Sequence, residues 1–169
     1  MGTISFDVKM TEKAMLDFFL YHTYSSLSGI FGVVFGFATL LFGIRAFSGG
    51  DQRAGMIFLF FTFFFWIFTP VNLKIKAKRQ VEKTPMFQKP LHYEMGEKGI
   101  EVSQEDEKMM NPWGEFTKAT ATSKSIIIYV TRVRALIFPK ECLGEQYEAV
   151  LKMISTHMPP AKVKIRHVR

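Results

Sequence analysis

The stretch Ile57–Phe68, IFLFFTFFFWIF, decides the architecture of this 169-residue chain. Seven of its twelve residues are Phe, and none is charged. The uncharged region extends from Ala54 to Leu73, and these twenty residues, as a helix, span about 30 Å, the hydrocarbon thickness of a bilayer. This window therefore predicts a transmembrane helix.

A second window of twenty uncharged residues precedes it, from Ser25 to Ile44, with the sequence SSLSGIFGVVFGFATLLFGI. The alternative is a pair of core helices in a soluble all-α protein, but two helices that are apolar all round would overfill a small core. A cleaved signal peptide is disfavoured because the window begins only at residue 25 and is too long for an h-region. The sequence predicts a transmembrane helical hairpin over residues 25–73, with spans at 25–44 and 54–73.

The connection Arg45–Arg53, RAFSGGDQR, is short and contains turn-forming residues, so the two spans must be antiparallel. It holds two basic residues, whereas the segment after the second span, KIKAKRQVEK, holds five: Lys74, Lys76, Lys78, Arg79 and Lys83. By the positive-inside rule, this asymmetry predicts a multi-pass protein with both termini in the cytoplasm. Thr69-Pro70 is expected to kink or end the second span.

The first span is rich in small residues, and the second is rich in large aromatic ones. A candidate helix-packing face consists of Gly29, Gly32, Gly36 and Gly43. Such a face lets another backbone approach closely. The partner is either the Phe-rich helix of the same chain or a second copy of the protein, so a homo-oligomer stays open.

The net charge of +7 is distributed unevenly. Residues 85–159 carry nine Lys or Arg against ten Asp or Glu, so the excess lies in the basic juxtamembrane linker 74–84 and in the basic tail 160–169. We expect the linker to lie beside the anionic inner leaflet, with four candidate contacts to lipid headgroups: Lys74, Lys76, Lys78 and Arg79. The alternative is that these residues only set the topology. Membrane lipid is the favoured partner over nucleic acid.

The segment before the first span, residues 1–24, predicts a strand followed by an amphipathic helix. Ile4, Phe6, Val8 and Met10 alternate with polar or charged neighbours, which predicts a strand from Ile4 to Met10, and Thr11 is placed to cap the helix. A lone strand is unstable, so we expect it to join a sheet formed by the chain after residue 85.

Residues 85–159 predict a small α+β domain that ends in a helix. Gly96-Glu97-Lys98-Gly99 is typical of a hairpin turn, and Pro139 introduces a helix expected over Lys140–His157. The expected strands lie within LHYEM (91–95), GIEVS (99–103), WGEFTKATAT (113–122), KSIIIYVT (124–131) and ALIF (135–138).

The order of several residues resembles the YcxB-like family of bacterial membrane proteins. The residues that carry the resemblance are Tyr93, Gly99-Ile100, Trp113, Ile126-Ile127-Ile128-Tyr129 and Leu136-Ile137-Phe138-Pro139-Lys140. The resemblance implies a membrane hairpin in the bacterial inner membrane plus a cytoplasmic domain similar to bacterial pleckstrin-homology-like (PH-like) domains, a partly open β-barrel or sheet capped by a C-terminal helix. Trp113, Tyr129, Phe138 and Pro139 are expected to anchor the core of this domain. The resemblance brings no catalytic motif with it.

The residues themselves give no catalytic or metal-binding constellation. The four histidines show no ligand spacing, and the single cysteine, Cys142, is expected to be a buried thiol rather than a nucleophile. Glu105-Asp106-Glu107 is expected to be a solvated turn rather than a metal site, and Trp113 a core residue rather than a stacking platform for a ligand. We therefore expect no catalytic residue, no cofactor and no metal.

These observations favour a non-catalytic, membrane-anchored protein that acts as an interaction or regulatory adaptor for a protein partner that the sequence does not identify. The alternative is an immunity or envelope-stress protection protein that acts through its transmembrane hairpin. The two differ in which region binds the partner.

Overall fold

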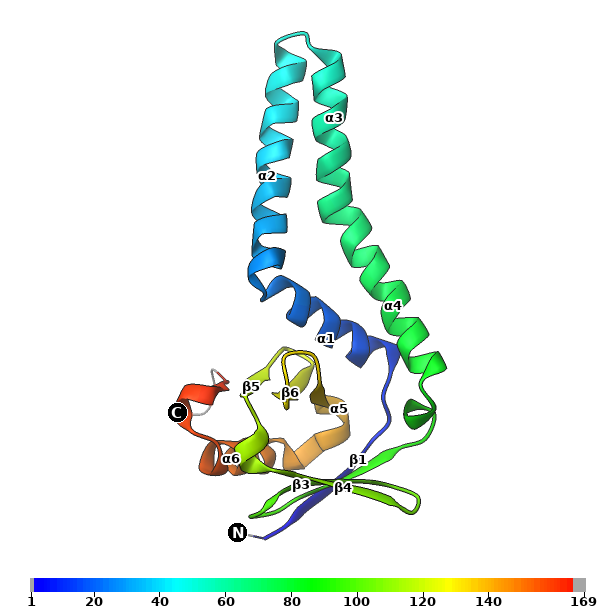
Figure 1. Ribbon diagram of the computed structural model, residues 1–169, viewed down its shortest axis with the longest axis vertical. Coiled ribbons are helices and arrows are strands. Elements are labelled where there is room, and N and C mark those ends of the chain that lie inside the picture. The colour runs from blue at the N-terminus through cyan, green and yellow to red at the C-terminus, as the bar shows by residue number, and fades with distance from the viewer. Residues whose placement is uncertain (1, 166–169) are drawn as a thin grey trace. The chain divides into compact units, whose positions relative to one another are not determined.

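The structure is a computed structural model that describes residues 2–165, and it divides into two compact units. The hairpin unit is Phe19–Lys78. The globular unit is formed by the chain up to Phe18 and from Arg79 onward, so the hairpin is inserted within the sequence of the globular unit. Each unit is described by itself (Figure 1).

The hairpin unit contains two long antiparallel helices joined by a short turn (Figure 1). Helix α2 (Leu27–Ser48) begins at Ser26, whose hydroxyl accepts from the N–H of Gly29, and α3 (Gln52–Phe63) begins at Asp51, which caps it in the same way. Both long helices are apolar and long enough to cross a membrane. The two uncharged windows thus form the helices that the sequence predicts.

Thr69-Pro70 was expected to kink or to end the second span. The expectation that the helix ends there is wrong. The second long helix runs from Gln52 to Lys83 through a π-helical turn (Phe64–Phe68) and α4 (Thr69–Lys83). Pro70 has no N–H to donate, and a wider turn just before it lets the helix continue without that bond. The segment 74–83, expected as a linker, is helical because Lys, Ala, Arg, Gln and Glu are good helix formers.

The small residues of α2 face the aromatic residues of the second helix. A Cβ added to Gly36 would lie 2.2 Å from Nε1 of Trp66, and one added to Gly43 would lie 3.3 Å from Cβ of Phe58. One added to Gly32 would lie at an ordinary 3.5 Å from Phe65. These three members of the packing face therefore lie against the same chain. Gly29 differs, because its nearest neighbour is the carbonyl of Thr23, before the helix.

The first sheet of the globular unit confirms that the N-terminal strand pairs with the chain beyond the hairpin. Strand β1 pairs antiparallel with β2, in a register that places Ile4 opposite Met95 and Val8 opposite Leu91. The order is β1-β2-β3-β4, from strands β1 (Ile4–Val8), β2 (Leu91–Met95), β3 (Gly99–Gln104) and β4 (Glu107–Pro112). The sequence did not predict β4, since EKMMNP lacks β-branched and aromatic residues.

The second sheet has the order β7-β6-β5-β8. Its strands are β5 (Lys118–Ala121), β6 (Ser125–Tyr129), β7 (Ala135–Pro139) and β8 (Val163–Lys164). Strand β8 is parallel to β5 and lies within the segment expected to be a basic tail. All five residues of β6 are buried, so this strand is covered on both faces.

Helix α1 (Glu12–Tyr24) begins at Thr11, whose hydroxyl accepts from the N–H of Ala14 at 3.2 Å, as expected for a cap. Its first turns belong to the globular unit. Asp17 accepts from the hydroxyl of Thr122 at 2.6 Å, and Phe18 lies 6.0 Å from the ring of Tyr129. The first turns of α1 thus lie against the β5–β6 turn and the last residue of β6.

The C-terminal helical region is interrupted, which corrects the expectation of one helix over Lys140–His157. Helix α5 (Lys140–Leu143) ends at Gly144, whose φ of +50° is left-handed, and α6 (Tyr147–His157) follows a single 3₁₀ turn. Glycine adopts this backbone conformation without steric cost. The face of α6 that includes Val150, Leu151 and Ile154 is buried.

The core of the globular unit lies between its two sheets and α6. Phe138 is fully buried and makes edge contacts with Phe6 and Tyr93. Trp113 is buried, donates from Nε1 to the carbonyl of Gly96 at 2.9 Å and stacks on His157. Tyr129 and Pro139, the other two expected anchors, are also buried.

Candidate functional site

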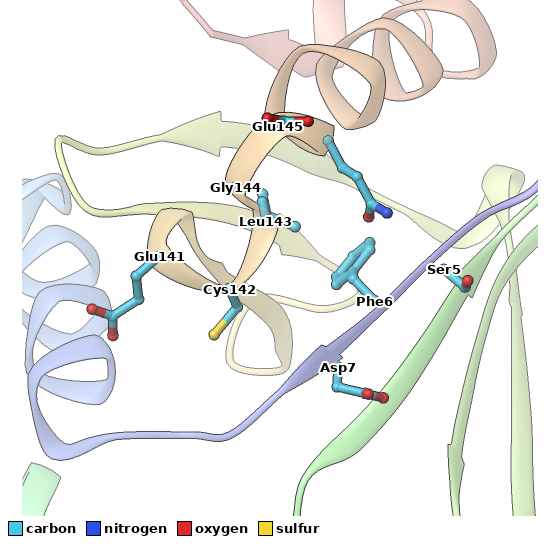
Figure 2. Close-up of a pocket in the computed structure, with 9 residues that line it drawn as sticks. Ser5, Phe6, Asp7, Glu141, Cys142, Leu143, Gly144 and Glu145 are labelled. Atoms are coloured by element: carbon cyan, nitrogen blue, oxygen red, sulfur yellow. The ribbon is translucent and has the colours of Figure 1, made fainter.

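A groove of about 560 Å³ lies between strand β1 and the α5 turn (Figure 2). All of its lining residues belong to the globular unit. They are Ser5, Phe6, Asp7, Glu141, Cys142, Leu143, Gly144, Glu145 and Gln146. The volume is within the range of pockets that hold ligands or side chains of a partner.

One wall is the outer edge of β1. The alternation of hydrogen-bonded and non-bonded residue pairs in the sheet shows which residues form this edge. The N–H of Gly96 donates to the carbonyl of Gly99 at 3.0 Å, so these two form a hydrogen-bonded pair of the β2–β3 ladder. Bonded and non-bonded pairs alternate along an antiparallel ladder, so Tyr93 directs its backbone groups toward β1. Its partner in β1 is Phe6.

Ser5 and Asp7, on either side of Phe6, therefore direct their N–H and C=O groups away from β2. Among residues 2–165, neither has a backbone hydrogen bond outside the sheet. The backbone N–H of Lys9, two residues further along the same edge, lies near Cys142 and acts to lower the pKa of its thiol, against the larger effect of burial. This edge of β1 thus faces α5 and leaves the backbone groups of two residues available.

The opposite wall is the turn that joins α5 to α6. Its shape depends on Gly144, around whose Cβ position there is open space within 4 Å. Figure 2 shows Glu145 on this wall, and Cys142 directed toward the strand. The wall is placed by β7, which leads directly into α5 at Pro139.

Three carboxylates give the groove its charge. Asp7, Glu141 and Glu145 are exposed, and none of the described lining residues is Lys or Arg. Asp7 lies 2.7 Å from Nδ1 of His92, its cross-strand neighbour on the outer face of the sheet. The groove therefore favours a positively charged or hydrogen-bonding ligand over an anionic one.

Cys142 is half-buried in the groove wall rather than fully buried, which corrects the expectation from the sequence. The helix that carries it ends one residue later, so the thiol faces the edge of β1 instead of the core. Burial is the main cause that raises the pKa of this thiol, and Glu141 adds to the effect. At neutral pH the group is therefore a protonated thiol, a weak nucleophile.

A second hollow, of about 440 Å³, lies beside the first turn of α1. Three lysines line it, Lys13, Lys124 and Lys140, together with Glu141 and the fully buried Ser125. The Nζ of Lys140 lies over the ring of Tyr147. Glu141 thus lies between a basic hollow and the acidic groove.

The candidate lipid contacts form a separate set, on α4. Lys74, Lys76, Lys78 and Arg79 are exposed, and Nζ of Lys76 lies 5.1 Å from the centre of the Phe19 ring. In the basic tail, Lys162 donates to the carbonyl of Phe116 at 2.8 Å. Arg166 and Arg169 lie outside the described residues.

The other polar residues considered in the sequence are separated from one another. Glu105 forms the β3–β4 turn with a left-handed φ of 54° and pairs with Lys89, which lowers the pKa of its carboxyl group. Nδ1 of His157 lies 3.0 Å from the carbonyl of Met153. Within residues 2–165, no group of three or more His, Cys, Asp or Glu is placed to hold a metal ion.

The groove could not be predicted from the sequence, because its walls come from residues far apart in the chain. Ser5 and Cys142 both line the groove only because of the pairing of β1 with β2 and the course of β7. The alternation over Ile4–Met10 indicated a half-buried strand, but it did not indicate which segment lies beside the edge of that strand.

Comparison with known proteins finds one family that part of the chain matches. No curated protein and no solved structure matches the chain. Residues 96–154, from the β2–β3 turn into α6, match the family described as YcxB-like protein. This region contains all of the residues that carried the resemblance except Tyr93. The resemblance to the YcxB-like family is thereby confirmed over residues 96–154.

Proposed function

We propose that this protein is a non-catalytic, membrane-anchored adaptor whose globular unit binds a partner protein at the cytoplasmic face of the bacterial inner membrane. The observation that carries the proposal is the insertion of the hairpin within the globular unit. Strand β1 precedes the hairpin and completes a sheet whose other strands follow it. The globular unit is therefore tied to the hairpin at two points, near Phe18 and Arg79.

Anchoring in a membrane is supported by the surface of the hairpin. The exposed side chains of its long helices are large and apolar, among them Phe31, Val34, Leu41 and Phe60. A contiguous surface of this kind in water would cause aggregation. The five basic residues of 74–83 against Arg45 and Arg53 support the orientation with both termini in the cytoplasm.

A binding role is supported by the open sheets of the globular unit. Two four-stranded sheets and α6, which precedes only the short edge strand β8, support a PH-like arrangement, and such sheets leave edges that accept another strand. The described residues of the groove carry carboxylates and a protonated thiol in an open cleft, an arrangement suited to contact rather than to chemistry.

Affinity capture from crosslinked membranes tests the adaptor. The full chain with a C-terminal tag is expected to recover a stoichiometric partner, and a chain lacking residues 85–169 is expected to lose it. A partner retained by the truncated chain assigns binding to the hairpin and favours immunity or envelope-stress protection instead. Repeated failure of the full chain to recover any partner contradicts the adaptor.

Contact of Lys74, Lys76, Lys78 and Arg79 with anionic lipid is a subsidiary proposal, supported by their exposure on α4. Nanodiscs of zwitterionic and of anionic lipid distinguish it from a pure topology signal. If the four residues bind headgroups, anionic lipid slows hydrogen exchange of the α4 amides. Changing the four residues to Gln is then expected to remove this protection. Equal protection in both lipids contradicts headgroup contact.

A further inference from the structure

We propose that the groove beside β1 binds an extended, basic segment of the partner protein, which adds to the sheet as a strand next to β1. This inference rests on the proposed adaptor function and deepens it. It names the edge that is used, the conformation of the bound segment and the sign of its charge.

The backbone geometry supports strand addition at this edge. Ser5 and Asp7 each present an N–H and a C=O outward, two residues apart, which is the spacing of the groups that an adjacent strand pairs with. An exposed edge of this kind is a ready template for a further strand. Ser5 and Asp7 line the groove, whereas Lys9 does not, so the added strand lies beside Ser5 and Asp7.

The side chains around the edge specify the pattern of the segment. Asp7 lies on the outer face of the sheet, and Phe6 lies on the inner face, where it is buried. A strand added beside them alternates in the same way. Its outward side chains come near Asp7, and its inward ones come near Phe6 and Cys142. A basic residue at every second position, with an aliphatic residue between, fits both faces.

Charge decides between a basic partner and a second copy of this protein. Antiparallel pairing of two β1 edges would bring Asp7 of each copy into the same acidic region, with Glu141 and Glu145 of both copies nearby. Like charges across paired strands are destabilising. A cationic segment is attracted by the same three carboxylates, so charge complementarity favours it.

A direct binding measurement tests the inference on the full chain in nanodiscs of zwitterionic lipid, which do not attract a basic peptide. The probe is a capped seven-residue peptide of alternating Lys and Val, and its counterpart has Glu in place of Lys. We expect the Lys-containing peptide to bind saturably and the Glu-containing peptide not to bind. Salt is expected to weaken the binding of the Lys-containing peptide. Because Cys142 is the only cysteine, its alkylation by N-ethylmaleimide reports occupancy of the groove and is expected to slow when the peptide binds.

Two sets of substitutions localise the binding. The triple variant Asp7→Asn, Glu141→Gln, Glu145→Gln is expected to bind about tenfold more weakly. The matched control changes three other exposed acids, Asp106→Asn, Glu115→Gln and Glu148→Gln, and alters the net charge equally. It is expected to bind like the unchanged chain. Ser5→Pro removes an outward N–H without removing a bond to β2, and it is expected to abolish strand addition.

The emission of Trp113, with Trp66→Phe as background, and thermal unfolding establish that each variant is folded before it is compared. Equal binding by the triple variant and its control, or peptide binding that leaves Cys142 alkylation unchanged, overturns the inference. Dimers that Ser5→Pro converts to monomers would assign the edge to a second copy and overturn it as well. If the triple variant still captures the membrane partner, the adaptor survives and the groove is not its binding site.

Discussion

The hairpin and the globular unit hide opposite kinds of residue. The hairpin exposes large apolar side chains and buries Gly36, Thr39, Gly43 and Thr62 between its helices. The globular unit buries its aromatic and aliphatic residues and exposes charge. Water drives apolar surface into a core, whereas lipid gives no such drive between helices, so close packing of small residues and hydrogen bonds hold them together. This difference is the one expected if the hairpin lies in lipid and the globular unit in water, and the predictions below test it.

The largest expected effect is on the rates at which two thiols are labelled. Exposure in the structure alone ranks position 34 above Cys142, and a surrounding membrane is expected to reverse that ranking. Val34 is 58% exposed on the hairpin, whereas Cys142 is half-buried. In membranes, we expect a charged, water-soluble thiol reagent to label native Cys142. The variant Val34→Cys in a Cys142→Ser background is expected to react slower by orders of magnitude, because lipid excludes the reagent and disfavours the thiolate.

Solubilisation in denaturant supplies the control, since both thiols should then react at similar rates. Faster labelling of the Val34→Cys variant in intact membranes would mean that the hairpin surface faces water, and the comparison would fail. The pH dependence of the labelling rate gives a second test of this comparison. The raised pKa of Cys142 shifts its labelling profile to higher pH than that of a free cysteine, since the thiolate is the reactive form.

Truncating a buried ring of the globular unit is the next largest effect. Phe6 is 7% exposed and stacks on Tyr93, so Phe6→Ala is expected to lower the free energy of unfolding of the globular unit by about 3–5 kcal/mol. With Trp66→Phe as background, Trp113 is the sole tryptophan, and its emission during denaturant titration measures this quantity.

The matched substitution in the hairpin is Phe31→Ala, at a side chain that is 71% exposed. It removes the same atoms but no packing partner, and the Trp113 transition is expected to be unchanged. A small effect of Phe6→Ala would mean that β1 contributes little to the globular unit, and the two-point attachment of the hairpin would lose its structural basis.

Within the hairpin, two glycines test whether close contact with the facing helix matters. Gly36 is in such contact, and Gly32 is not. A methyl group at Gly36 would meet Nε1 of Trp66 at 2.2 Å, so Gly36→Ala forces the indole to move and is expected to weaken helix packing by about 1–3 kcal/mol. Gly32→Ala adds the same methyl at an ordinary 3.5 Å from Phe65. Trp66 emission during unfolding in SDS, in a Trp113→Phe background, is expected to change for Gly36→Ala alone. Equal effects would show that the glycines act only through backbone flexibility.

The parts of the fold that the sequence predicted depend on local patterns. Uncharged windows of bilayer length predict helices by length and composition. The alternation over Ile4–Met10 predicts a strand that requires a partner, and the observed strand is shorter, because it ends at Val8. Strand β4 was missed because Met109 and Met110 do not indicate a strand, and its pairing comes from the adjacent turn. The break at Gly144 was missed because a glycine within an apolar helical stripe does not reveal its φ. The groove depends on tertiary contacts, so no local pattern predicted it.

The smallest expected effect concerns the one buried polar contact described between α2 and α3. The hydroxyls of Thr39 and Thr62 lie 3.0 Å apart, and each also lies 3.0 Å from a carbonyl of its own helix, that of Gly36 or Phe58. Each hydroxyl has one hydrogen to donate, so one of them donates across to the other helix while the other donates to its local carbonyl. Removing one partner leaves the other with that local bond, so no hydroxyl becomes unpaired. A double-mutant cycle of Thr39→Val and Thr62→Val is therefore expected to give a coupling of only about 0.6 kcal/mol, typical of such bonds between membrane helices. A coupling of several kcal/mol would mean that a polar network, rather than the close approach at Gly36, holds the hairpin together. The hairpin would then differ from the globular unit by polar bonding rather than by the packing of small residues.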